Sequence, residues 1–216
     1  MRFAAKPQGG IFLSGKMEQS QKKFYNILVN GGSKDNLIVY EMMKYIPDDF
    51  SGKLLEIPAN GSKAVCGKFA KLKNADITCV DKDSDVLENL SKTFADRKIS
   101  SVKTVVENID DKLSFEDNTF DIVLSINGFD KFAKKDRAIS QTLRVLKKGG
   151  LLIASFYTEG HSKLTDWQVK QKLVKSGVLV PPFYTATSVQ TTFGEIYEIK
   201  HFHEVGSMVY FCAVKK

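Results

Sequence analysis

The sequence predicts an α/β fold, a doubly wound and mostly parallel sheet of seven strands that ends in an antiparallel β-hairpin. Two observations lead to this prediction. Between residues 53 and 157, apolar runs of strand length alternate with segments of helical length, which is the pattern of repeated βαβ units. The last two strand-like runs, 196–205 and 207–214, follow each other too closely for a crossover helix and should therefore pair antiparallel.

The first five predicted strands come from largely apolar runs. Such runs are typical of parallel strands that helices cover on both faces. The runs are KLLEI (53–57), DITCVD (76–81), SVKTVVE (101–107), FDIVLSI (120–126) and LLIASFY (151–157).

Apolar residues at helical spacing predict the helices between these strands. The predicted helices are 63–72, 84–94, 137–146 and, after the fifth strand, 166–175. Val65, Phe69 and Leu72 show the spacing in the first of them. Two more predicted helices precede the first strand, so we expect 1–50 to be an N-terminal helical lid or lead-in and 51–216 to be the main domain.

The composition excludes several classes of protein. The net charge is +7, but the basic excess is thin and evenly spread, with no basic arm or arginine-rich run, which indicates a solvated surface rather than a nucleic-acid partner. No apolar run approaches the roughly 20 residues of a membrane helix, and we expect no secretory signal. The three cysteines form no metal-binding pattern and suit a reducing cytosol, so we expect a cytoplasmic protein.

Polar residues lie where the predicted strands end, and ligands bind at these ends in such sheets. The first strand opens into the turn 58–62, and Asp81 ends the second strand about 20 residues later. An acid at this distance can accept hydrogen bonds from both hydroxyls of a ribose. Asp81 is also in place to cap the following helix, and the residues alone leave both readings open.

Several segments, in the right order, resemble the motifs of class I S-adenosylmethionine-dependent methyltransferases. LLEIPANGS (54–62) resembles the first motif, an acid followed by a glycine-rich loop. The later motifs are matched by ITCVDKDSDVLENLSK (77–92), LSFEDNTFDIVLSINGF (113–129) and LRVLKKGGLLIASFY (143–157). The resemblance implies a Rossmann-like methyltransferase fold, S-adenosyl-L-methionine as the cofactor, and methyl transfer to a small-molecule acceptor, as in a bacterial small-molecule-type subgroup.

The resemblance also implies a set of site residues. The implied cofactor contacts are Glu56, Pro58, Ala59, Asn60, Gly61, Asp81, Lys82, Ile109, Asp110, Asn127 and Gly128. A match without gaps selects Ile109 at the adenine, whereas a shift by one residue selects Asp110. The implied substrate contacts are Tyr25, Phe129, Tyr157, His161 and Trp167, for which core packing or an exposed loop is the alternative. No catalytic residue stands out. We expect no metal, because His201 and His203 lack a third ligand.

The first motif departs from the family, since Pro58, Asn60 and Ser62 occupy the positions of its three glycines. A dinucleotide needs bare backbone N–H groups there for its pyrophosphate, whereas S-adenosylmethionine has no phosphate. The departure therefore argues against NAD. It also leaves two alternatives, a catalytically weak or inactive binding protein of the same fold, or a methyltransferase of RNA or protein. We further expect that the chain can form a homodimer.

Overall fold

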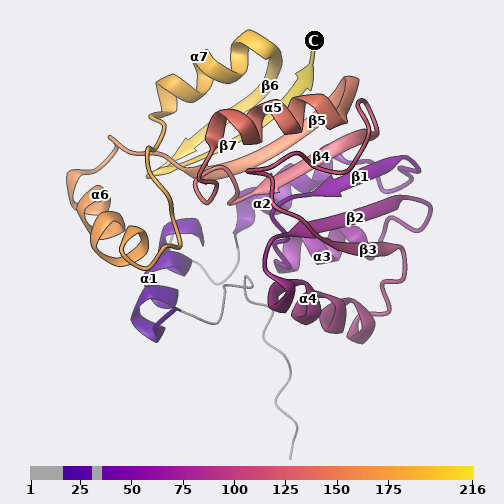
Figure 1. The fold of residues 1–216 in the computed structure, drawn as a ribbon, viewed down its shortest axis with the longest axis horizontal. Helices are drawn as coiled ribbons and strands as arrows, with labels where there is room; N and C mark the ends of the chain where they lie inside the picture. Colours follow the sequence, from indigo (N-terminus) through magenta and orange to yellow (C-terminus); the bar gives the residue numbers. More distant parts are fainter. Residues whose placement is uncertain (1–16, 31–35) are drawn as a thin grey trace, which may run out of the picture.

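The computed structural model describes residues 17–30 and 36–216, which form a seven-stranded sheet with helices on both faces (Figure 1). The strands are β1 (Lys53–Glu56), β2 (Asp76–Asp81), β3 (Val102–Val106), β4 (Phe120–Ile126), β5 (Leu146–Tyr157), β6 (Tyr197–Val205) and β7 (Met208–Lys215). Their order is β3-β2-β1-β4-β5-β7-β6. The first five strands pair in parallel, and β7 pairs antiparallel with both β5 and β6, so the predicted fold class is confirmed.

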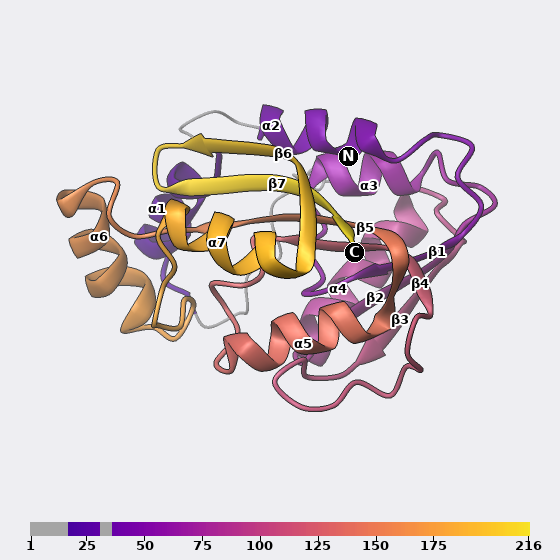
Figure 2. The ribbon, with the colours of Figure 1, turned by 90° about the horizontal axis from the view of Figure 1, so that it is seen from above.

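The helices pack into two separate hydrophobic cores, one on each face. The first core takes residues from α1 (Gln19–Asn30), α2 (Leu37–Met42), the 3-10 turn η1 (Met43–Tyr45), α3 (Lys63–Phe69), α4 (Ser84–Asp96), α6 (Lys163–Val169) and the π-helical turn η2 (Lys170–Val174). The second takes residues from α5 (Lys135–Val145) and α7 (Ala186–Ile196). Seen from above, α2 and α3 lie on one side of the sheet and α5 and α7 on the other (Figure 2).

The pleat of the strands explains why their sequences are so apolar. Successive side chains of a strand point to opposite faces. Leu54 therefore packs in the first core and Leu55 in the second, and neither side chain has any exposed surface. A strand covered by helices on both sides needs apolar residues at both alternating positions.

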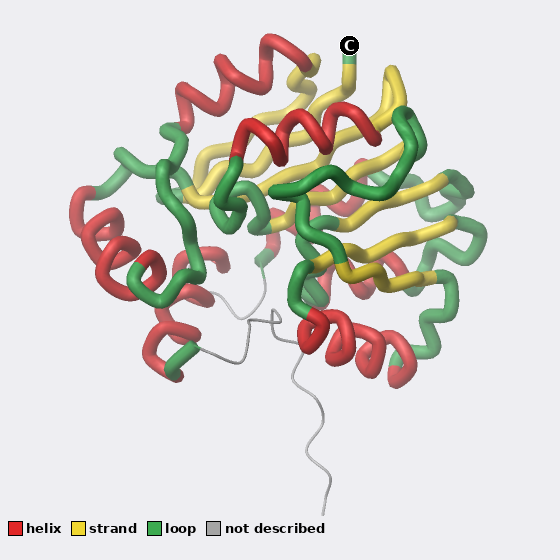
Figure 3. The backbone as a smooth tube through the Cα atoms, in the orientation of Figure 1, coloured by secondary structure: helices red, strands yellow, loops and turns green. Residues whose placement is uncertain are grey.

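The connection between β3 and β4, where no helix was predicted, runs as a loop (Figure 3). The helix pattern differs from the prediction mainly in two places. The helix predicted at 166–175 begins earlier, at Lys163, and changes to a π-helical turn at Lys170. The sequence analysis missed α7 altogether. Its start is fixed by a capping box, in which Thr185 and Ser188 each bond the backbone of the other.

The N-terminal segment is described only in part, because residues 1–16 and 31–35 lie outside the described ranges. The helices α1 and α2 share the first core with the rest of the chain, and the expected boundary at residue 50 stays a prediction. No helix in the described ranges has the length and the apolar composition needed to cross a membrane.

Candidate functional site

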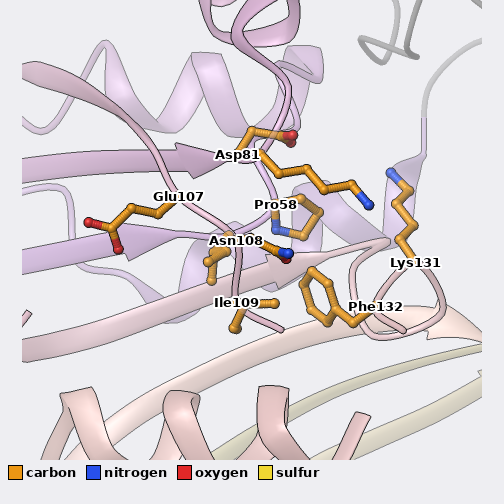
Figure 4. Close-up of a pocket in the computed structure, with 9 residues that line it drawn as sticks. Pro58, Asp81, Glu107, Asn108, Ile109, Lys131 and Phe132 are labelled. Atoms are coloured by element: carbon orange, nitrogen blue, oxygen red, sulfur yellow. The ribbon is translucent and has the colours of Figure 1, made fainter. Parts of the chain in front are cut away.

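A pocket opens at the carboxyl ends of the parallel strands. It lies where the chain, after building β2 and β3 on one side of β1, returns to build β4 on the other, which is the switch point at which such sheets bind ligands. The cavity volume is about 70 Å³. The lining residues are Ile57, Pro58, Asp81, Lys82, Glu107, Asn108, Ile109, Lys131 and Phe132 (Figure 4).

The turn 58–62 forms one wall of the pocket and is tied to the neighbouring strands. The Ala59 N–H donates to the Val80 carbonyl at 2.9 Å. The Asn60 side chain donates from Nδ2 to the Ile126 carbonyl at 3.1 Å and accepts from the Ser62 N–H at 3.0 Å. The positive φ of the turn falls on Gly61, at +64°. Asn60 therefore uses its side chain to bridge to β4, where the family has a glycine without one.

Asp81 lies at the end of β2 and faces the pocket (Figure 4). It does not cap α4, because the cap is Asp83, whose side chain accepts from the Asp85 N–H at 3.0 Å. One Asp81 oxygen, Oδ1, accepts from the Asp83 N–H at 3.0 Å. Burial raises the pKa of the Asp81 carboxyl, and the Asp83 N–H and the charge of Lys131 lower it. Oδ2 makes no hydrogen bond within the described ranges.

Ile109 and Asp110 have different environments. Ile109 lines the pocket, as Figure 4 shows. Asp110 is turned toward the start of α5, where its carboxylate accepts from the backbone N–H groups of Ala133 at 3.1 Å and Lys134 at 2.7 Å. The geometry therefore brings Ile109 to the pocket and gives Asp110 a role in holding the loop between β4 and α5.

Gly128 lets the loop after β4 approach the turn 58–62. A Cβ at this position would lie 2.2 Å from Ser125 Oγ and 2.8 Å from Pro58 Cδ, which is closer than real contacts allow. Asn127 adopts a φ of +54°, and its N–H donates to Ser155 Oγ at 3.1 Å. Lys82 lines the pocket with an exposed side chain.

The residues that the resemblance implies for the substrate are scattered. Tyr25 and Tyr157 are buried, and the Tyr157 hydroxyl donates to Asp166 at 2.7 Å. Phe129 belongs to the aromatic core, with its ring 5.2 Å from that of Phe193. His161 is exposed, 3.6 Å from Glu204, and Trp167 is 58% exposed. None of these five residues lines the pocket. Tyr25 and Tyr157 contact the loop after β4 through Lys131 and Asp130, and Phe129 lies on that loop.

Sequence analysis missed two residues on the loop between β4 and α5. Lys131 and Phe132 line the pocket. Asp130 is fully buried, and its Oδ2 accepts from the Tyr157 N–H at 2.9 Å. The nearest sequence signal is the run of polar and aromatic residues directly after β4, but nothing in it shows that Lys131 points back toward the strand ends.

Several buried polar atoms at this edge of the sheet have no hydrogen-bond partner among the described residues. They belong to Tyr25 (Oη), Glu56 (Oε1), Ser125 (Oγ) and Asp130 (Oδ1). An unpaired buried polar atom costs about 1–3 kcal/mol, so such a group of atoms indicates a place for a ligand. The site combines carboxylates with apolar walls and lacks a glycine-rich phosphate-binding loop. It therefore suits a cationic nucleoside cofactor that has no phosphate. Among the described residues, no group of His, Cys, Asp and Glu could hold a metal ion.

Comparisons with known proteins find similarity to methyltransferases. Residues 58–154 match the family model described as a methyltransferase domain. The "Ubiquinone/menaquinone biosynthesis C-methyltransferase UbiE" of Shewanella pealeana is 31% identical over 134 residues, which cover 59% of this chain and 53% of that protein. The chain therefore spans about half the length of this curated relative.

Solved structures share the fold at low sequence identity. A SAM dependent methyltransferase from Aquifex aeolicus superposes with a TM-score of 0.65 and 11% identity, over 92% of this chain and 100% of that one. The [4+2]-cyclase SpnF also gives a TM-score of 0.65, at 15% identity over 82% and 80% of the two chains. This likeness concerns the fold alone. With the ordered motifs, the matched family model makes residues 58–154 similar to a methyltransferase domain, and the solved structures show that the chain shares the Rossmann-like methyltransferase fold.

Proposed function

We propose that the protein transfers a methyl group from S-adenosyl-L-methionine to a small-molecule acceptor. The observation that carries the proposal is the pocket that brings the acidic Asp81 together with the apolar Ile109 and Pro58. A carboxylate beside an apolar wall suits the two parts of an adenosine, its ribose hydroxyls and its base. The cofactor supplies an electrophilic methyl group on a sulfonium, so the task of the protein is to bind and align the reactants.

In this proposal, residues at different strand ends contact different parts of the cofactor. Asp81 accepts hydrogen bonds from the ribose, Ile109 packs against the adenine, and Lys82 borders the ribose at the surface. The methionine part lies along the turn 58–62 beside Glu56. Asn127 and Gly128 border the reacting side, and Asp110 keeps the loop between β4 and α5 in place through its two backbone contacts.

The proposed acceptor side lies between α1 and the end of β5. Tyr25 and Tyr157 are buried there, and burial is the main cause that raises the pKa of both hydroxyls. The next cause is the charge of Asp130 for Tyr25 and the hydrogen bond to Asp166 for Tyr157. Buried aromatic side chains at this place favour a small acceptor over a macromolecule. The name of the Shewanella relative, a C-methyltransferase of quinone biosynthesis, supports a small molecule that is methylated on carbon.

Calorimetry with S-adenosylmethionine tests the proposal. We expect the parent protein to bind the cofactor, and Asp81→Ala to bind it about 10 to 100 times more weakly, because hydrogen bonds to a charged group are lost. Asp83→Ala is the matched control. It removes the cap of α4 at a cost of about 0.5–2 kcal/mol in stability, with an unchanged dissociation constant.

Two results would contradict the proposal. If the parent releases no heat at near-millimolar cofactor, the alternative of an inactive binding protein is favoured. If Asp81→Ala binds as tightly as the parent, the ribose assignment is wrong even though the cofactor binds.

A further inference from the structure

Lys131 holds an unusual position at the pocket. Its backbone N–H donates to the Gly128 carbonyl at 2.8 Å, which fixes a tight turn after β4. Its ammonium nitrogen lies 5.5 Å from the centre of the Tyr25 ring, within the range of a cation–π contact. Figure 4 shows the side chain rising from the loop toward the side of the pocket on which Asp81 lies. The charge of this lysine thus reaches the space between α1 and the strand ends.

Three carboxyl groups lie within electrostatic reach of Lys131. Burial lowers the pKa of the Lys131 ammonium, and the carboxylates of Asp130, Asp81 and Glu56 raise it, in this order of strength. Conversely, the charge of Lys131 lowers the pKa of each of these carboxyl groups, which burial raises. Within the described ranges Lys131 makes no ion pair. Lys131 lines the pocket together with Asp81 and directly follows the buried Asp130, so its ammonium lies near more than one carboxylate without pairing to a single one.

We propose that Lys131 is the internal counter-ion of this carboxylate cluster in the free protein, and that its ammonium competes there with the positive charge of the cofactor. Lys131 then determines how strongly the site prefers S-adenosylmethionine, whose sulfur is positively charged, over S-adenosylhomocysteine, whose sulfur is neutral. This inference rests on the proposed function. Its physical reason is that two cations near the same three carboxylates repel each other in a site where burial weakens solvent screening.

The small size of the pocket indicates that Lys131 moves when the cofactor enters. Its volume of about 70 Å³ is far below the roughly 300–1,000 Å³ of pockets that enclose drug-sized ligands, so a lining side chain has to move for a nucleoside to enter. Lys131 is suited to move, because it is long, only half-buried and without an ion pair in the described structure. Phe132 is fixed by its ring contact with Phe129, at 5.8 Å, and Pro58 by its backbone.

A different role for Lys131 would have a different signature. If the ammonium bound the carboxylate of the methionine part, it would favour both ligands equally, since both carry that carboxylate. Competition acts only on the ligand with the additional positive charge. The ratio of the two affinities therefore separates the two roles.

The test is calorimetry of S-adenosylmethionine and S-adenosylhomocysteine with the parent and three variants, each checked for folding by circular dichroism. Lys131→Met removes the charge and should raise the affinity ratio in favour of S-adenosylmethionine about tenfold. Lys131→Arg keeps the charge and should keep the ratio of the parent. The matched control, Lys134→Met, removes an exposed lysine from the same loop outside the pocket lining and should leave the ratio within about twofold. If Lys131→Met does not fold, Lys131→Gln takes its place.

Each outcome is decisive. An unchanged ratio in Lys131→Met, or an equal loss of affinity for both ligands, would overturn the inference while leaving the proposed function intact. A raised ratio in Lys131→Arg would assign the effect to shape rather than charge, and would also overturn it. If the parent binds neither ligand, the proposed function itself fails and the inference fails with it.

Discussion

Glu56 ends β1 with a fully buried carboxyl group, and this burial raises its pKa to about 7. The Cys79 thiol, which donates to Glu56 Oε2 at 3.2 Å, and the Asn60 N–H lower the pKa, but by less than burial raises it. Oε1 has no partner among the described residues. Glu56 can therefore change its charge near neutral pH, beside the turn where we propose that the methionine part of the cofactor binds.

This raised pKa predicts a specific dependence of stability on pH. The ordinary value is 4.5, so between pH 4.5 and about 7 the folded protein retains a proton that the unfolded chain has lost. The contribution of Glu56 is fully present below pH 4.5 and is lost as the pH rises to about 7, by up to about 3 kcal/mol. Urea unfolding of the parent and of Glu56→Gln should show the stability of the parent, relative to the variant, falling between about pH 4.5 and pH 7. A difference that does not change with pH would contradict the assignment.

At the scale of elements, α1 is attached to the sheet by few polar contacts. The Tyr210 hydroxyl on β7 donates to the Val29 carbonyl at 3.1 Å and accepts from Asn36 Nδ2 at 3.0 Å. Gln21 Nε2 donates to the Lys172 carbonyl of η2 at 3.1 Å. Since Tyr25 and its contact with Lys131 lie on this helix, these bonds also position the proposed acceptor side.

Tyr210→Phe should loosen α1 selectively. The variant loses two hydrogen bonds and should lose about 1–2 kcal/mol of stability. Hydrogen exchange should become faster in α1 and stay unchanged in β1 and β4. The matched control is Tyr197→Phe, because the buried Tyr197 hydroxyl has no partner among the described residues. Equal effects of the two substitutions would show that Tyr210 does not hold α1.

The elements also show which parts of the secondary structure sequence patterns alone can predict. The strands β2 and β4 have the predicted bounds. In a sheet that helices cover on both faces, the apolar run forms the buried strand and the polar residues at its ends lie outside it. The helix α7 was missed because its sequence, ATSVQTTFGEI, is rich in residues of low helix propensity. Packing of Val189 and Phe193 against the second core compensates for this low propensity.

On the scale of the whole molecule, the second core joins α7 to the wall of the pocket. The ring of Phe193 lies 4.9 Å from that of Phe211 on β7 and 5.2 Å from that of Phe129. Phe129 in turn contacts Phe132, which lines the pocket. The aromatic rings therefore form a continuous connection from a surface helix to the proposed cofactor site.

Phe193→Ala should destabilise the whole fold by about 3–5 kcal/mol, because it removes a buried ring from the centre of this core. S-adenosylmethionine at about 100 times its dissociation constant should restore about 2.7 kcal/mol, since it binds only the folded state. Unfolding with and without the cofactor measures both quantities. Phe202→Ala, which removes a half-buried ring at the edge of the core, should cost less. The prediction is wrong if the cofactor stabilises the parent but not Phe193→Ala.

The sequence by itself determined the sheet, the closing hairpin, and the position of Asp81 and of the turn 58–62 at the strand ends. Alternation of strand and helix patterns is a local property, and a parallel arrangement then brings the carboxyl ends of the strands to one edge. Only the tertiary structure decided that Ile109 and not Asp110 lines the pocket, that Asp83 and not Asp81 caps α4, and that Lys131 lies among three carboxyl groups. These features depend on how loops from distant parts of the chain pack against each other, and no periodicity in the sequence records that packing.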